Sequence, residues 1–180
     1  MSEYSAYKAL TSLAALCRKS AKGLPSQVDV APRWSGVGFS ILGQKFVAPM
    51  GQMTELMELP GWTRLPGVQA WVIGLSNVRG RLLPLFDLSR FFGGAMSGQK
   101  KNHRVLVLET ENLYSGIVVD MAFGMQHFTA DMFGEYQGEI PEGVSPFVKG
   151  AYRDAAGEQW AVFNMATLAD DARFLNAAAV

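Results

Sequence analysis

The chain has 180 residues, 49% hydrophobic and 18% charged, which is the composition of a globular protein with little disorder. Sixteen basic and sixteen acidic residues cancel, so the composition favours neither nucleic acid nor an anionic membrane surface as a partner. The only cysteine, Cys17, allows no internal disulfide and no cysteine-based zinc site. With no secretory signal and no apolar run near ~18 residues, we expect a cytoplasmic protein without direct membrane insertion.

The N-terminal segment differs in pattern from the rest of the chain. Residues 4–22 carry leucines at helical spacing and a basic last turn, and Gly23 and Pro25 follow. This pattern predicts an amphipathic helix, packed either on its own domain or on a partner. Residues 24–36 predict a linker.

From residue 37 onward, short apolar runs alternate with turns that contain glycine or proline. The predicted strands are 37–42, 46–49, 52–58, 71–78, 81–86, 103–109, 114–125, 147–153 and 159–163. Such short strands favour a barrel or a sandwich, and the absence of alternating strands and helices argues against a parallel sheet. Periodicity alone leaves open one large barrel or two small ones.

Two short helices are predicted from their capping residues. Asp87 or Ser89 caps the first, which ends at Gly93, and Asn164 caps a single C-terminal helix. The apolar face of that last helix comprises Met165, Leu168, Ala172 and Leu175, while Asp170 and Asp171 are interpreted as a solvated face. The polar stretch 93–101 predicts a connection between subdomains, and 176–180 predicts a tail.

The sequence carries no residue pattern that would indicate an enzyme. His103 and His127 have no metal-ligand spacing, and the chain has neither a phosphate-binding glycine loop nor a nucleophile elbow. We therefore expect no catalytic residues, no bound metal and no cofactor.

Residues 71–88 form the most distinctive stretch, in which two apolar arms flank a polar corner at 77–81. Asn77 and Gly80 suit a corner that requires positive φ angles. Arg79 is costly to bury there unless a carboxylate meets it, and Glu55 is the candidate partner. The pair either only fixes the corner or also shapes the floor of a groove for a partner.

Three further residues are candidates for the same binding function. Gly74, inside the first apolar arm, indicates either a bend in a barrel or a close approach of a partner. Val118 and Asp120 either belong to the core or pair across two barrels.

This stretch resembles the signature of the CheW family, the coupling proteins of bacterial chemosensory arrays. The matching residues are Gly74-Leu75, Asn77, Arg79-Gly80, Leu83-Pro84-Leu85 and Asp87-Leu88. Further segments match in family order at 39–59, 116–120, 147–150 and 160–164. The resemblance covers roughly residues 33–175.

The resemblance implies a mainly β fold of two five-stranded SH3-like β-barrels around a shared hydrophobic core, with helices at both ends. The domain then spans 33–175, after a helix and linker at 1–32. The implied function is a non-catalytic adaptor that binds the cytoplasmic tip of a methyl-accepting chemoreceptor and the regulatory domain of a CheA-type histidine kinase. Through these partners the protein would associate with membrane receptor arrays. The implied protein-binding residues are Glu55, Gly74, Asn77, Arg79, Gly80, Val118 and Asp120.

The extended N-terminal segment and the bulky Trp71 and Phe86 favour the CheW-like proteins of type IV pilus twitching motility. The alternative within the family is a swimming-chemotaxis adaptor. An alternative of another class is a small-molecule-binding β-barrel, which requires an interior not filled by the barrel's own side chains.

Overall fold

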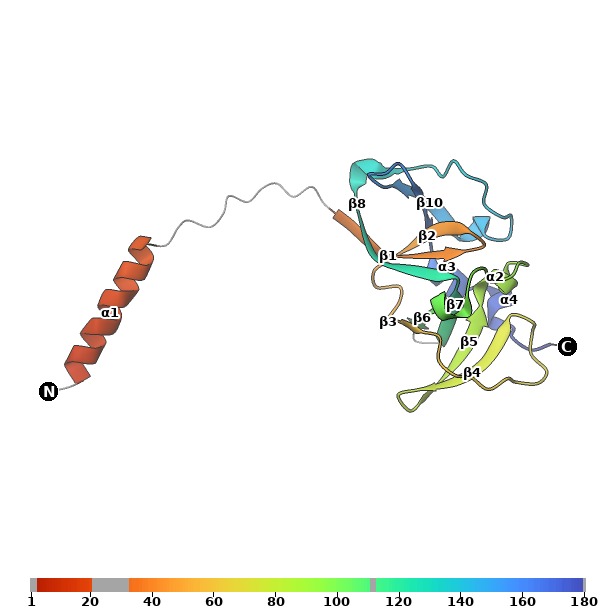
Figure 1. The fold of residues 1–180 in the computed structure, drawn as a ribbon, viewed down its shortest axis with the longest axis horizontal. Helices are drawn as coiled ribbons and strands as arrows, with labels where there is room; N and C mark the ends of the chain where they lie inside the picture. Colours follow the sequence, from red (N-terminus) through yellow and green to blue (C-terminus); the bar gives the residue numbers. More distant parts are fainter. Residues whose placement is uncertain (1–2, 21–32, 111–112, 180) are drawn as a thin grey trace. The chain divides into compact units, whose positions relative to one another are not determined.

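The computed structural model describes residues 3–20, 33–110 and 113–179 (Figure 1). The chain divides into two units, Met1–Ala31 and Pro32–Val180. The first contains the predicted amphipathic helix, α1 (Glu3–Ser20). The predicted linker falls largely outside the described residues, and its last four residues, 33–36, instead begin the first strand. None of the described helices has the length and hydropathy needed to cross a membrane.

The second unit is built from two sheets, which Figure 1 shows one above the other. Sheet A has the strand order β8-β1-β2-β11-β10-β9, and sheet B the order β3-β6-β7-β5-β4. The strands of sheet A are β1 (Arg33–Ile41), β2 (Gln44–Pro49), β8 (Met121–Thr129), β9 (Phe133–Gly134), β10 (Val148–Arg153) and β11 (Gln159–Phe163). The strands of sheet B are β3 (Glu55–Glu58), β4 (Val72–Val78), β5 (Arg81–Asp87), β6 (Arg104–Glu109) and β7 (Tyr114–Val119).

Each sheet curls until its two edges meet. In sheet A, the edge strands β8 and β9 are joined by the single turn η2 (Ala130–Met132), so the chain passes directly from one edge of the sheet to the other. In sheet B, Thr63 follows β3 and exchanges two backbone hydrogen bonds with Leu75 of β4, at 2.9 and 2.8 Å. Closure of this kind leaves few unpaired edges. The predicted mainly β fold of two barrels is confirmed, with five strands in sheet B and six in sheet A, where the two-residue strand β9 is the additional one.

Three apolar clusters fill the unit. The interior of barrel A holds residues such as Phe128 and Trp160, and the interior of barrel B holds residues such as Leu83 and Val107. The third and largest cluster combines Phe39 and Phe46 of sheet A with Phe86, Leu106 and Ile117 of sheet B. This is the predicted shared core. Each barrel interior is thus occupied by side chains of the barrel itself, in contrast to a barrel that holds a ligand inside.

The chain crosses between the sheets at places that the sequence did not indicate. It leaves sheet A at residues 50–54 and returns at Asp120, where the run predicted as one strand, 114–125, divides into β7 of sheet B and β8 of sheet A. The segment 93–101, predicted as a connection between subdomains, instead links β5 to β6 within sheet B.

The C-terminal helix is broken in two, so the prediction of one helix was wrong. The two helices are α3 (Met165–Ala169) and α4 (Ala172–Leu175), and Asp171 between them caps α4. The break rotates the apolar face, so that Phe174 is buried and Leu175 is exposed. The remaining helices are α2 (Leu88–Phe91) with Asp87 as its predicted N-cap, η1 (Lys100–Asn102) and η3 (Ser145–Phe147).

The segment that follows α4, predicted as a tail, lies against the loop before β4. Gln69 donates a backbone hydrogen bond to Ala177, and Ala179 donates one to Gly67, at 2.9 and 3.0 Å. The end of the described chain therefore helps to fix the loop that leads into the signature hairpin.

We expect Asp171→Ala to lower the free energy of unfolding by about 1 kcal/mol near neutral pH, because α4 loses its N-cap. Bidentate hydrogen bonds from Arg173 lower the pKa of Asp171. A lowered pKa means that the stabilisation is present above the usual aspartate value of 3.8 and is lost as the pH falls through the folded value.

Urea unfolding at about pH 7 and about pH 3 tests this expectation, and the difference between wild type and variant should shrink at the lower pH. Asp171→Asn is the matched control, since it keeps a capping oxygen without a titrating group. An equal difference at both pH values would contradict a role for the ionised carboxylate.

Candidate protein-binding site on the β4–β5 hairpin

The signature stretch forms a tight hairpin with a two-residue turn. Val78 pairs with Arg81, and the turn residues Arg79 and Gly80 have φ angles of 52° and 82°. Such a turn needs two positive φ angles, which makes arginine an unfavourable residue at the first position. Asn77 does not supply a positive φ, in contrast to the prediction. Its side-chain oxygen instead accepts a hydrogen bond from the backbone N–H of Gly80 at 2.9 Å.

The predicted ion pair between Glu55 and Arg79 is present, with 2.7 Å between Arg79 Nη2 and Glu55 Oε1. The arginine lies on the surface, however: its side chain is 77% exposed and that of Glu55 is 30% exposed. A pair this open to water contributes at most about 1 kcal/mol to stability. Arg79 therefore presents its charge on the surface, and the stability of the fold depends little on the ion pair.

A second ion pair extends this surface. Arg81 lies 2.9 Å from Glu109 at the end of β6, and its guanidinium stacks 3.9 Å above the ring of Tyr114 at the start of β7. The hydrogen bond from Arg81 to Glu109 raises the pKa of the arginine. We call the surface formed by Glu55, Arg79, Arg81, Glu109 and Tyr114 the hairpin rim.

Sequence reasoning did not single out Glu109 and Tyr114 as members of this surface. They reach the hairpin only through the pairing of β6 with β7 and of β7 with β5. Leu82, next to Arg81, is 62% exposed and adds an apolar side chain beside the charges. Arginine and tyrosine beside exposed apolar side chains are typical of protein-binding surfaces.

Gly74 lies inside the barrel wall and not on a partner-facing surface. A Cβ atom added to it would lie 2.2 Å from the backbone oxygen of Thr63, and its φ of 149° also disfavours a side chain. The close neighbour that this glycine indicated is therefore Thr63 of the same chain, at the point where Thr63 and Leu75 close barrel B.

Val118 and Asp120 are also buried. Val118 belongs to the interior of barrel B. The carboxylate of Asp120 accepts hydrogen bonds from the backbone N–H and the hydroxyl of Ser97, at 2.9 and 2.7 Å. Of the seven predicted binding residues, Glu55, Asn77, Arg79 and Gly80 thus come together at the hairpin, whereas Gly74, Val118 and Asp120 have internal positions.

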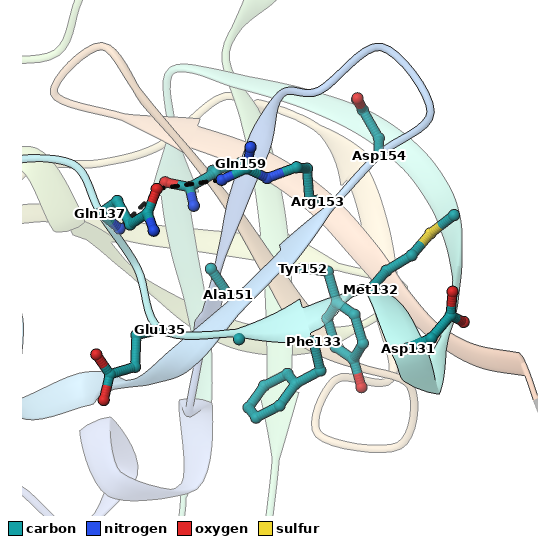
Figure 2. Close-up of a pocket in the computed structure, with 11 residues that line it drawn as sticks. Asp131, Met132, Phe133, Glu135, Gln137, Ala151, Tyr152, Arg153, Asp154 and Gln159 are labelled. Atoms are coloured by element: carbon teal, nitrogen blue, oxygen red, sulfur yellow. Dashed lines mark hydrogen bonds between the residues drawn. The ribbon is translucent and has the colours of Figure 1, made fainter.

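Barrel A carries a hollow of about 380 Å³ where β9 meets β10, shown in Figure 2. Its central polar groups bond to one another: Gln137 accepts from Arg153 at 3.2 Å and donates its backbone N–H to Gln159 at 3.1 Å. Asp154 accepts from the N–H groups of Ala156, Glu158 and Trp160. Because these groups already have partners, the hollow is a weaker candidate site than the hairpin rim.

No group of three or more histidine, cysteine, aspartate or glutamate side chains in residues 3–20, 33–110 and 113–179 is arranged to hold a metal ion. The acid at the end of the signature, Asp87, has a structural role. It accepts the backbone N–H of Arg90 at 2.9 Å as the cap of α2, and burial raises the pKa of its carboxyl group.

Comparison with known proteins agrees with this architecture. The family model described as CheW-like domain matches residues 35–173. The scaffolding protein TtCheW from Thermoanaerobacter tengcongensis has a similar fold, with a TM-score of 0.62 over 74% of this chain and 90% of that chain, at 19% sequence identity. The chain belongs to the CheW family, a class of scaffolding adaptors.

Within that family, the chain is similar to Protein PilI of Pseudomonas aeruginosa, with 44% identity over 90% of each chain. Its identity to the chemotaxis protein CheW of Helicobacter pylori is 29%, over 57% of this chain and 62% of that protein. The predicted membership of the CheW family is confirmed, and so is the predicted resemblance to the PilI type within it.

Proposed function

We propose that this protein couples a methyl-accepting chemoreceptor to a CheA-type histidine kinase in an array that controls type IV pilus twitching motility. Membership of a family of scaffolding adaptors supports the coupling role, and the 44% identity to PilI over most of both chains supports the pilus pathway. An adaptor biases kinase output only if it binds the active and inactive arrangements with different affinity. The protein would then be located in the cytoplasm, at membrane receptor arrays, through its partners.

The observation that carries the assignment of a binding surface is the exposed Arg79. Asparagine or glycine would adopt the φ of 52° at this turn position more easily than arginine does. The chain nevertheless has a surface arginine there, paired to Glu55. A strained residue that contributes little to stability indicates a role outside the fold. Charged residues of this kind steer association and determine which partner fits.

We expect Arg79→Asn to leave the fold intact and to weaken binding to the receptor tip about tenfold, which corresponds to ~1.4 kcal/mol. Asparagine tolerates the positive φ, so the turn is kept while the charge is removed. Arg79→Glu should weaken binding further, because it also repels Glu55.

The measurement is titration of a receptor signalling-tip fragment, and separately of kinase regulatory domains from pilus and swimming systems, with chemical denaturation alongside. Arg153→Ala, an exposed arginine of barrel A, is the control that should bind as wild type. A folded Arg79→Asn protein with unchanged affinities would remove the hairpin rim from the site. Wild-type protein that binds neither partner would contradict coupling, and preference for the swimming kinase would contradict the pilus pathway.

A further inference from the structure

The helix α1 carries large apolar side chains that are exposed in the unit to which it belongs. Tyr7, Leu10, Leu13 and Leu16 are 68%, 67%, 58% and 61% exposed. A helix of this kind gains most of its stability when its apolar face packs against another surface. The size and charge of the side chains on this face indicate which surface fits it.

The seam of the apolar face is symmetric about its centre. Alternating steps of four and three residues, as in the seam of a coiled coil, connect Ala6, Leu10, Leu13 and Cys17. The side chains follow the order small, large, large, small, so a helix that runs in the opposite direction presents the same order. In an antiparallel pair, Leu10 of each helix therefore meets Leu13 of the other.

The flanks of the seam favour the same arrangement. One flank carries Tyr7 and Ala14, and the other carries Ala9 and Leu16. Antiparallel helices bring like flanks together, so Tyr7 meets Ala14 of the second copy. Leu16 likewise meets Ala9, and each large side chain packs against a small one. Parallel helices would place Ala9 against Ala14 and leave a gap between them.

The charges at the end of the helix also oppose a parallel pair. Arg18 and Lys19 both lie in the last turn. Two parallel copies would bring these four cations together, and like charges at such short range repel. Antiparallel copies place them at opposite ends of a helix that is about 27 Å long, which exceeds the Debye length of about 8 Å at physiological salt.

We propose that α1 is a dimerisation helix, which pairs in antiparallel orientation with α1 of a second copy of this chain. The contact is isologous, since each helix contributes the same face. A strip about 27 Å long and about 10 Å wide is smaller than the ~800 Å² that each partner buries in a standard interface. The dimer is therefore weak and reversible. It joins two adaptors through a segment outside the CheW-like domain at 35–173 and outside the hairpin rim.

Sedimentation velocity of the full chain, at concentrations from about 1 to about 300 µM, tests the proposal. We expect an equilibrium of monomer and dimer with a Kd of about 10–100 µM. Leu13→Glu should raise the Kd at least about tenfold, because it places a charge in the seam while glutamate still favours a helix. Ser12→Glu adds the same charge on the polar face, and this matched control should dimerise as wild type.

Disulfide cross-linking measures the orientation of the two helices. Cys17 is the only cysteine of the chain, and it faces Ala6 of the second copy in the antiparallel pair. Ala6→Cys should therefore form disulfide-linked dimers under mild oxidation, whereas the wild type should not. Positions 6 and 17 of one helix are about 16 Å apart, too far for a disulfide within the chain. Lys8→Cys, on the polar face, is the control and should form none.

A chain that stays monomeric at about 300 µM would overturn the proposal, and so would a dimer that Leu13→Glu leaves unchanged. Efficient cross-linking of the wild type through Cys17 would show a parallel pair and overturn it as well. A monomeric chain in which Leu13→Glu lowers the denaturation midpoint, or the affinity for the receptor-tip fragment, would assign the helix to its own domain or to the receptor instead. Because dimerisation is measured without receptor or kinase, its failure leaves the coupling role unaffected.

Discussion

Gly74→Ala is expected to lower the free energy of unfolding by about 4 kcal/mol, the combined cost of a steric clash and an unfavourable backbone conformation. The added Cβ would lie 2.2 Å from the backbone oxygen of Thr63, and backbone cannot move aside as a flexible side chain does. The only relief is to separate Thr63 from Leu75, which breaks the two hydrogen bonds that close barrel B.

Chemical denaturation measures this effect, and Gly67→Ala is the matched control. Gly67 also has a positive φ, 66°, but nothing lies within 4 Å of the position of its added Cβ. Its substitution should lower the free energy of unfolding by only about 1 kcal/mol, because only the backbone conformation is unfavourable there. Equal effects at the two positions would show that contact with Thr63 is unimportant.

This result matters for interpreting binding data on the family signature. A larger substitution such as Gly74→Asp would abolish partner binding by disrupting barrel B, even if no partner touches residue 74. Arg79→Asn, in contrast, alters the surface with little effect on the fold. Comparison of the two variants therefore separates loss of folding from loss of contact.

Asp120→Ala is expected to destabilise the protein by about 2–4 kcal/mol, since hydrogen bonds to a buried carboxylate are strong and their donors would be left unpaired. Asp120 is 4% exposed, and its carboxylate accepts hydrogen bonds from Ser97 at 2.9 and 2.7 Å, with a longer contact of 3.4 Å from Ser89. It thereby ties the loop after α2 to the point where β7 passes into β8.

Hydrogen exchange of the Ser97 amide, together with the denaturation midpoint, measures the effect. Asp120→Asn is the conservative control, because it keeps one oxygen for the Ser97 N–H. It should lower the free energy of unfolding by about half as much as Asp120→Ala. Protection of the Ser97 amide that is unchanged in Asp120→Ala would contradict this role.

Local chemistry in the sequence was sufficient to predict several features of the structure. Asp87 could be recognised as a helix cap because a capping side chain acts on the next few residues. Most strands could be located because glycine-containing turns separate short apolar runs. The family signature then indicated two barrels with a shared core, which the three apolar clusters confirm.

Other features depend on residues that are far apart in the sequence. The run 114–125 is apolar on both sides of Asp120, so its pattern does not show that the chain passes from one sheet to the other at this residue. The break between α3 and α4 was missed because apolar spacing continued across it, although Asp171 is a capping residue. The neighbour of Gly74 could not be identified, because Thr63 reaches it only when barrel B closes.

The sequence by itself therefore determined the family, most of the strands and the candidate pair of Glu55 and Arg79. Only the tertiary structure decided that this pair lies on the surface, that Gly74, Val118 and Asp120 are internal, and that Arg81, Glu109 and Tyr114 extend the hairpin rim. The physical reason is that turn geometry and capping act over a few residues, whereas exposure depends on which strands pair and where each barrel closes.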